Sequence, residues 1–167
     1  ARTSAPQRSG ARAAMAALES SVVARMNVVR RSYGLRPFRP NRRLHAAAVF
    51  HSRDMGRRGY FAHDSLSGAP FWRRIERFYP SRGFSSWTVG ENLLWGSDTY
   101  GATFAVREWM NSPSHRQTML SRNWREVTYF PSRPVNCCAT KNGCDRNFCT
   151  LRARDTVSLS SSDSSSM

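Results

Sequence analysis

The chain has 167 residues, the size of a single domain, and 40% of them are hydrophobic, which is enough to build a core. Its 26 basic and 11 acidic residues give a formal net charge of +15 at pH 7, which favours anionic partners such as nucleic acid, anionic lipid or wall polymers. Every basic residue except Lys141 is an arginine, a bias that a GC-rich genome also produces, so charge alone does not identify a partner. No apolar run approaches the roughly 18 residues of a membrane-spanning helix, and we expect no transmembrane segment.

The first third of the chain predicts two helices after a flexible, basic lead-in over residues 1–17. An apolar stripe at helical spacing predicts the first helix, which ends before Gly34: Leu18, Val22, Met26, Val29 and Tyr33. Asn41 is a good N-cap for the second helix, and Gly56 and Gly59 are expected to end it. The stripe of this helix contains Leu44, Ala47, Ala48, His51 and Met55. We expect His51 to be a satisfied core histidine and His45 to be a surface residue.

Shorter elements follow. Residues 68–78 predict a third helix with Pro70 near its first position, and residues 99–110 predict a fourth. Residues 87–96, 126–130 and 147–153 are rich in β-forming residues and predict strands. This order favours an α+β fold in which helices flank a small antiparallel sheet.

The C-terminal part has an unusual composition. Four cysteines fall within residues 137–149: Cys137, Cys138, Cys144 and Cys149. They could form two disulfides in an exported protein, whereas a zinc knuckle is disfavoured because no CxxC pair is present. We expect a domain over residues 18–130, an atypical cysteine-containing segment over 131–154, and a disordered serine-rich tail over 155–167. Whether the cysteine-containing segment completes the sheet or is unrelated sequence stays open.

Four segments, taken together and in order, resemble one known family. They read MNVVRRSYGLRPFRPNRRLHAAAVFHSRDM, GYFAHDS, GENLLWG and EWMNSPSHRQTMLSRNWREV, and they span about residues 22–127. This run resembles the CAP superfamily of cysteine-rich secretory, antigen five and pathogenesis-related proteins, in its short bacterial SCP-like branch. The resemblance implies an α-β-α sandwich and an extracellular or cell-envelope location.

The resemblance also implies a cleft lined by two histidines and two acidic residues. His63 matches the first histidine, Glu91 the first acid and His115 the second histidine. Ser112 stands where the second acid is expected, and Glu108 precedes it by one helical turn and could substitute for it. The cleft residues that we predict are therefore His63, Glu91, His115, Ser112 and Glu108.

Two imidazoles and a carboxylate are the ligands of many catalytic zinc sites, so His63, His115 and Glu91 are candidate ligands of a weakly bound divalent metal such as zinc. The alternative is that His63 caps a turn and Glu91 accepts backbone hydrogen bonds in the turn that GEN forms. Ser112 and Pro113 have their own plain interpretation as the N-cap and first residue of a short helix. A serine nucleophile would need a base and an oxyanion hole, and the sequence indicates neither.

These observations favour an exported CAP-domain module that binds an unknown lipid, anionic polymer or small molecule, without an enzymatic role. The alternatives are a metal-dependent hydrolase that uses the same cleft and an arginine-driven binder of anionic polymers. No motif for specific nucleic-acid recognition is present, and we expect a monomer.

Overall fold

The computed structural model describes the backbone of residues 5–96, 101–132 and 153–163, and the side chains of residues 9–10, 12–94 and 101–130. Within these ranges the chain forms five helices, namely α1 (Ala5–Ser32), α2 (Arg42–Arg58), α3 (Phe71–Phe78), α4 (Ala102–Asn111) and α5 (Pro113–Leu120). It also forms four strands, namely β1 (Arg39–Pro40), β2 (Ser86–Gly96), β3 (Glu126–Ser132) and β4 (Ala153–Asp163). The four cysteines lie outside the described residues, so their pairing stays a prediction.

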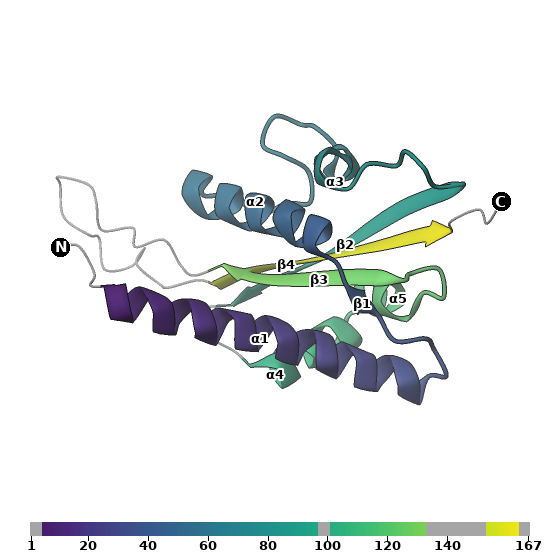
Figure 1. Cartoon of the computed structure of the whole chain (residues 1–167), viewed down its shortest axis with the longest axis horizontal. Helices are drawn as coiled ribbons and strands as arrows, with labels where there is room; N and C mark the ends of the chain where they lie inside the picture. The colour runs from purple at the N-terminus through teal and green to yellow at the C-terminus, as the bar shows by residue number, and fades with distance from the viewer. Residues whose placement is uncertain (1–4, 97–100, 133–152, 164–167) are drawn as a thin grey trace.

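The four strands form one sheet in the order β1-β3-β4-β2. Helices α2 and α3 cover one face of the sheet, and α1, α4 and α5 lie on the other (Figure 1). The predicted α+β class is therefore confirmed. The expectation of an antiparallel sheet is wrong for its edge, because β1 pairs with β3 in parallel, while β3 and β2 each pair with β4 in antiparallel fashion.

Two predicted flanking segments are corrected. Helix α1 begins at Ala5, so residues 5–17 are helical rather than a flexible lead-in. Alanine and arginine, which dominate this stretch, are strong helix formers even without an apolar stripe. The serine-rich stretch predicted to be disordered is strand β4 up to Asp163, because its backbone pairs with β2 on one side and β3 on the other. Long-range pairing has overridden local composition there.

Each helical layer packs its own apolar cluster against the sheet. The first cluster joins α1, α4, α5 and β3 through Val22, Met26, Trp109, Met119, Val127 and Tyr129. The second joins α2 and α3 through Leu44, Ala47, Ile75 and Tyr79. Val22 and Met26 belong to the predicted stripe of α1, and Leu44 and Ala47 belong to that of α2, whereas Tyr33, also predicted on the α1 stripe, is exposed. Burial of these clusters supplies most of the driving force for the fold.

The start and end of α2 follow local chemistry. The side-chain oxygen of Asn41 accepts hydrogen bonds from the backbone amides of Arg43 and Leu44, at 2.8 and 3.1 Å, as an N-cap does. Gly59, with φ of 73°, closes the helix in the left-handed conformation, whereas Gly56 lies inside the helix. The predicted cap is confirmed. Of the two glycines predicted to end the helix, only Gly59 does so.

We predict that the chain depends on β4 for its stability. Deleting everything after residue 152 leaves β2 without a hydrogen-bonded neighbour among the described strands. Domains are stable by only about 5–15 kcal/mol, and the loss of a central strand should remove most of that free energy of unfolding. Urea unfolding followed by circular dichroism should show a cooperative transition for a chain ending at Asp163 and none for a chain ending at residue 152. Equal transitions in the two chains would contradict the pairing of β4.

Candidate functional site

The carboxylate of Glu91, on strand β2, is the centre of a buried network of charged and polar groups. Its side chain is only 1% exposed, and both of its oxygens have partners. Oε1 lies 3.1 Å from Nδ1 of His63 and 3.8 Å from Nε2 of His51, and Oε2 lies 2.6 Å from a terminal nitrogen of Arg74. A buried carboxylate is stable only when it is paired in this way.

Arg74, on α3, neutralises Glu91 and also fixes the loop that carries His63. One terminal nitrogen donates to Glu91, and the other donates to the backbone carbonyl of His63 at 2.9 Å. The side chain is 3% exposed, and its Nε has no hydrogen-bond partner among the described residues. Sequence reasoning missed Arg74. Its position in the sequence could have indicated burial, because it lies three residues after Phe71 and four before Phe78 and so shares a mainly apolar helix face with them.

His51, on α2, is a core histidine, as its place on the apolar stripe predicts. It is 1% exposed, and its Nε2 lies 2.9 Å from the carbonyl oxygen of Ala62, to which it donates when that nitrogen carries the proton. Burial lowers the pKa of His51, and the negative charge of Glu91 opposes this effect without cancelling it. His51 therefore contributes a neutral imidazole to the wall of the network.

His63 differs from His51 because its side chain is 48% exposed. Its Nδ1 is within hydrogen-bond distance of Glu91, whose ionised form only accepts. In the neutral ring this places the proton on Nδ1 and leaves Nε2 with a lone pair. Glu91 therefore fixes both the tautomer and the orientation of a half-exposed imidazole.

His115, on α5, is linked to the strand that carries Glu91 through its backbone. The side chain of Asn92, the residue after Glu91, donates to the backbone carbonyl of His115 at 3.0 Å and so ties α5 to β2. Burial lowers the pKa of His115, and the positive charge of protonated His63 lowers it further. The structure thus joins His63 to Glu91 directly and ties the backbone of His115 to the neighbouring Asn92, whereas a shared site for the two imidazoles stays a prediction.

The remaining two predicted cleft residues are placed less centrally. Ser112 occupies the N-cap position of α5, but its side chain does not cap the helix, and its hydroxyl oxygen lies 3.4 Å from that of Ser114. Glu108, on α4, pairs with the adjacent Arg107 at 3.2 Å. No described contact joins Glu108 to either histidine or to Glu91, so the idea that it replaces the second acid stays a prediction.

The structure does not reproduce the full set of metal ligands that the sequence suggested. Within the described residues, no group of three or more His, Cys, Asp or Glu side chains is placed to hold a metal ion. Glu91 is already neutralised by Arg74, whose guanidinium would repel a divalent cation. Among the three candidate ligands, the carboxylate of Glu91 is instead placed as the group that orients the His63 ring.

The network also depends on a close approach at Gly90, the residue before Glu91. A Cβ atom at Gly90 would lie 3.0 Å from the ring of Trp124 and 3.4 Å from the methyl group of Thr118. The Trp124 ring is held by its indole nitrogen, which donates to the carbonyl of Thr118 at 2.7 Å. Gly90 thus lets the end of α5 and the following loop pack directly on β2.

The fold is a small mixed sheet between two helical layers, with the buried Glu91 on strand β2 bonded to the half-exposed His63. The chain belongs to the cysteine-rich secretory protein (CAP) family, and its residues 23–130 match the sequence model of that family. It is also 34% identical over 126 residues to the uncharacterised protein YkwD of Bacillus subtilis (strain 168). That alignment covers 75% of this chain but only 44% of YkwD, so the chain spans less than half of its relative's length.

Solved structures support the fold. An outer surface protein of Borrelia burgdorferi superposes with a TM-score of 0.63 at 17% identity, covering 85% of this chain and 90% of that protein. An extracellular SCP-domain protein of Bacillus anthracis superposes with a TM-score of 0.60 at 20% identity, covering 86% of this chain and 40% of that protein. These similarities show a shared fold. In the described part of the chain, every helix is too short or too polar to cross a membrane.

We predict that Gly90→Ala destabilises the protein by about 1–3 kcal/mol, because a rigid ring would have to move to accept the new methyl group. Gly10→Ala is the control, since a Cβ there meets nothing within 4 Å and α1 should gain from the better helix former. Urea unfolding of both variants and the wild type gives the two differences in free energy. An unchanged Gly90→Ala variant would show that Trp124 packs more loosely on β2 than these distances imply.

We predict that the protein loses stability as the pH falls below about 6.5, the unperturbed pKa of histidine. The folded-state pKa values of His51 and His115 are lowered, so the unfolded chain binds more protons in this window. For one proton of difference, the free energy of unfolding falls by at most about 1.4 kcal/mol per pH unit. Urea unfolding between pH 5 and 7.5 measures the slope. His51→Gln should flatten it, whereas Gly10→Ala, which removes no titrating group, should not; an equal slope in all three proteins would contradict the prediction.

Proposed function

We propose that this chain is an exported ligand-binding module, in which His63 and His115 present their imidazoles to a small ligand. The observation that carries the proposal is the hydrogen bond between the buried carboxylate of Glu91 and the half-exposed ring of His63. Burying the Glu91–Arg74 pair costs desolvation energy that a well-packed apolar pair would avoid. Its result is an imidazole held in one orientation at the surface, which is the arrangement of a binding site.

The ligand that suits this site is a small amphipathic molecule with a polar head and a lipid-like body. The imidazoles can accept or donate a hydrogen bond to the head, depending on protonation. Exposed apolar side chains stand close in sequence on either side of His63: Phe61, Leu66 and Trp72 are each at least 40% exposed. An apolar body packing on these side chains would be removed from water.

Export is supported by relatives and by composition. The similar solved structures are described as an outer surface protein and an extracellular protein, and the chain belongs to a secretory family. Four cysteines within 13 residues suit an oxidising compartment, where they would pair. We also propose that the complete chain, including the segment that bears the cysteines, forms an α-β-α sandwich.

A divalent cation such as zinc would be held by the two imidazoles, with Glu91 acting through His63. When bound, such an ion supplies a Lewis acid that polarises an oxygen of the ligand. The hydrolase alternative is less well supported, because a hydrolase would need a free general base and both oxygens of Glu91 are engaged. Binding without turnover is the function that this geometry favours.

We predict weak, exchangeable zinc binding that His63→Ala and His115→Ala each reduce by about tenfold or more, because each removes a proposed ligand and even the loss of an outer-shell partner costs a metal site about tenfold. The control is His45→Ala, since His45 lies on α2 beside Glu19 rather than at this site. Binding should weaken at acid pH as the imidazoles protonate, with His115 protonating later than an ordinary histidine. Isothermal titration calorimetry with zinc chloride measures the affinities.

A fluorescent fatty acid serves as the second probe in the same variants. We expect Trp72→Ser to weaken fatty-acid binding and to leave zinc binding unchanged, because Trp72 offers apolar surface and no ligand atom. His63→Ala should weaken both. If neither histidine variant differs from the wild type with either probe, the two imidazoles do not form a shared site and the proposal is wrong.

A further inference from the structure

We propose that the chain has a second site, separate from the histidine site, that binds a phosphate group in a pocket lined by arginines. The pocket has a volume of about 260 Å³ and lies between the turn that links α1 to β1 and the loop that links α5 to β3. Its lining residues are Gly34, Leu35, Arg36, Arg122 and Arg125. Pockets for whole drug-sized ligands begin at about 300 Å³, so this one suits a single small anionic group.

The three lining guanidinium groups are not neutralised by the protein. Arg36 and Arg122 are exposed and Arg125 is half-buried, and none of them takes part in an ion pair among the described residues. One terminal nitrogen of Arg125 donates to the carbonyls of Arg122 and Trp124, at 2.7 and 3.4 Å. The described contacts leave the guanidinium of Arg36 and that of Arg122 without a hydrogen-bond acceptor, although arginine carries five donors for phosphate or carboxylate oxygens.

A fourth arginine, Arg30, builds the pocket from behind. Its side chain is buried, stacks on the ring of Phe38 at 3.9 Å and donates to the carbonyl of Arg36 at 2.8 Å. Its terminal nitrogen donates to the carbonyls of Met119 and Ser121, at 2.7 and 3.0 Å. Arg30 therefore joins the two segments that form the pocket walls and holds them in a fixed arrangement without a bound ligand.

The buried charge of Arg30 adds to the positive potential of the pocket. All of its described acceptors are neutral carbonyl groups, so its charge is solvated by dipoles but not cancelled. Burial and the nearby positive charge of Arg125 together lower the pKa of Arg30 to about 10, which leaves it charged at neutral pH. Four like charges at close quarters repel one another, and an anion placed among them would relieve that repulsion.

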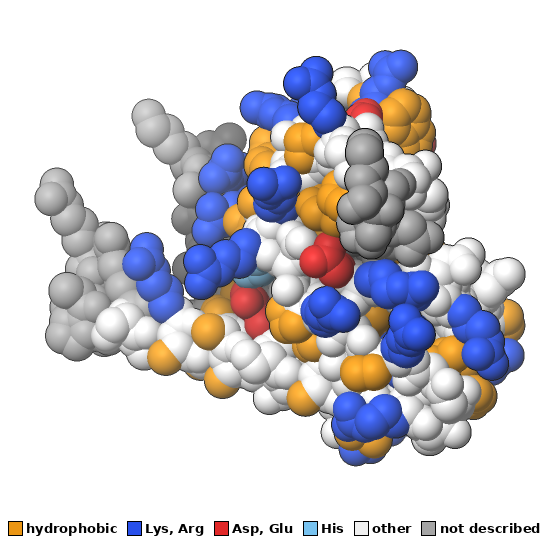
Figure 2. Space-filling model, turned by 45° about the vertical axis from the view of Figure 1, so that its right-hand side comes forward, with side chains coloured by type: hydrophobic (Ala, Val, Ile, Leu, Met, Phe, Trp, Pro, Cys, Tyr) orange, Lys and Arg blue, Asp and Glu red, His pale blue; other side chains and the backbone are white. Residues whose placement is uncertain are grey.

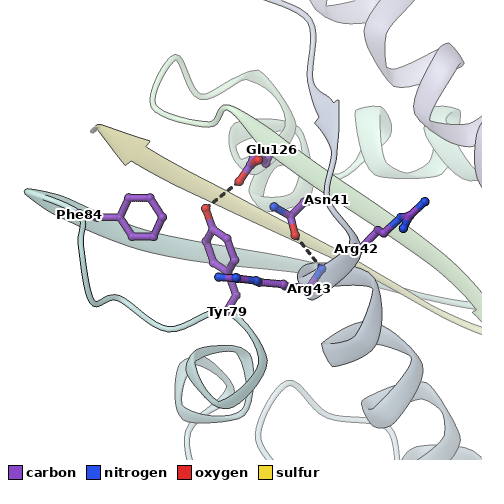
Figure 3. A pocket seen from close by; sticks show the side chains of 6 residues that line it. All are labelled: Asn41, Arg42, Arg43, Tyr79, Phe84 and Glu126. Carbon is purple, nitrogen blue, oxygen red and sulfur yellow. Dashed lines mark hydrogen bonds between the residues drawn. The ribbon is translucent and has the colours of Figure 1, made fainter. Parts of the chain in front are cut away.

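Further arginines follow this pocket on β1 and at the start of α2. Arg39, on β1, donates its backbone amide to the carbonyl of Arg125 at 3.0 Å, and a second pocket lies beyond it at the start of α2. That pocket is lined by Asn41, Arg42, Arg43, Tyr79, Phe84 and Glu126 (Figure 3). There Arg43 extends beside the ring of Tyr79, whose hydroxyl donates to Glu126 at 2.7 Å, while Arg42 extends away from it.

This arrangement fits a polymer that carries repeated phosphate groups better than a free ion. The arginine pocket would hold one phosphate, and Arg39, Arg42 and Arg43 would attract the phosphates that follow along the chain. Figure 2 brings this end of the molecule forward and shows arginine groups far outnumbering acidic groups on the visible face. A GC-rich genome explains a high arginine content, but it does not explain why three arginines line one pocket behind which a fourth is buried.

The test uses the full chain and two double variants that remove equal charge. Arg36→Gln with Arg122→Gln alters the pocket, and neither guanidinium makes a described hydrogen bond that folding would lose. Arg12→Gln with Arg25→Gln removes the same charge from exposed positions on α1. Circular dichroism melting should be alike in all three proteins. Zinc binding should also be alike, which separates failure of this proposal from failure of the histidine site.

The probes are inorganic phosphate and a long-chain polyphosphate, titrated by calorimetry at several salt concentrations. We expect the pocket variant to bind polyphosphate more weakly than the α1 variant. Its slope of log affinity against log salt should fall by about 2, because two guanidinium groups no longer neutralise phosphates. Competition by inorganic phosphate would identify a single-group site, and binding of polyphosphate alone would identify a polymer site. Equal losses in the two double variants, or no binding of either probe by the wild type, would overturn the proposal.

Discussion

The ion pair between Glu91 and Arg74 is the interaction on which the histidine site depends. It connects β2 to α3 across the sheet–helix interface, and both side chains are almost fully removed from water. Breaking such a pair by removing one partner typically costs about 3–5 kcal/mol, because the other charge is left buried and unpaired. The same two residues bond to the ring and the backbone of His63. Stability and site geometry therefore cannot be altered independently at these positions.

The chain handles its other buried arginine differently. Arg30 has no carboxylate among its described partners and is instead surrounded by three backbone carbonyls and an aromatic ring. Arg74 is neutralised by Glu91 and therefore adds little positive potential to the surface near it. Arg30 keeps its charge and adds to the positive potential of the pocket in front of it. One protein thus uses two solutions to the cost of burying a guanidinium, and the two proposed sites differ in character accordingly.

Sequence reasoning succeeded where the determining interactions are local. The Asn41 cap and the apolar stripe of α2 were predictable because a cap acts over three residues and a stripe over one helix. The strand β4 was not predictable, because its partners in β2 and β3 lie between 22 and 77 residues away along the chain and its own composition suggests disorder. Arg74 was missed for a similar reason, because no residue near it in the sequence indicates that it pairs with Glu91, 17 residues further on.

The grouping of His63, Glu91 and His115 came from the resemblance to a family and not from their spacing, which is too long to imply a shared helix face. What the resemblance could not supply was the charge balance of the site. Arg74 cancels Glu91, and Ser112 stands where a second acid was expected, so neither of the two predicted acid positions supplies an uncompensated negative charge. A site of this balance has less attraction for a cation than one with two free carboxylates. Protonating either imidazole would make it positive, which favours a ligand whose polar head is neutral or anionic over a tightly held metal ion.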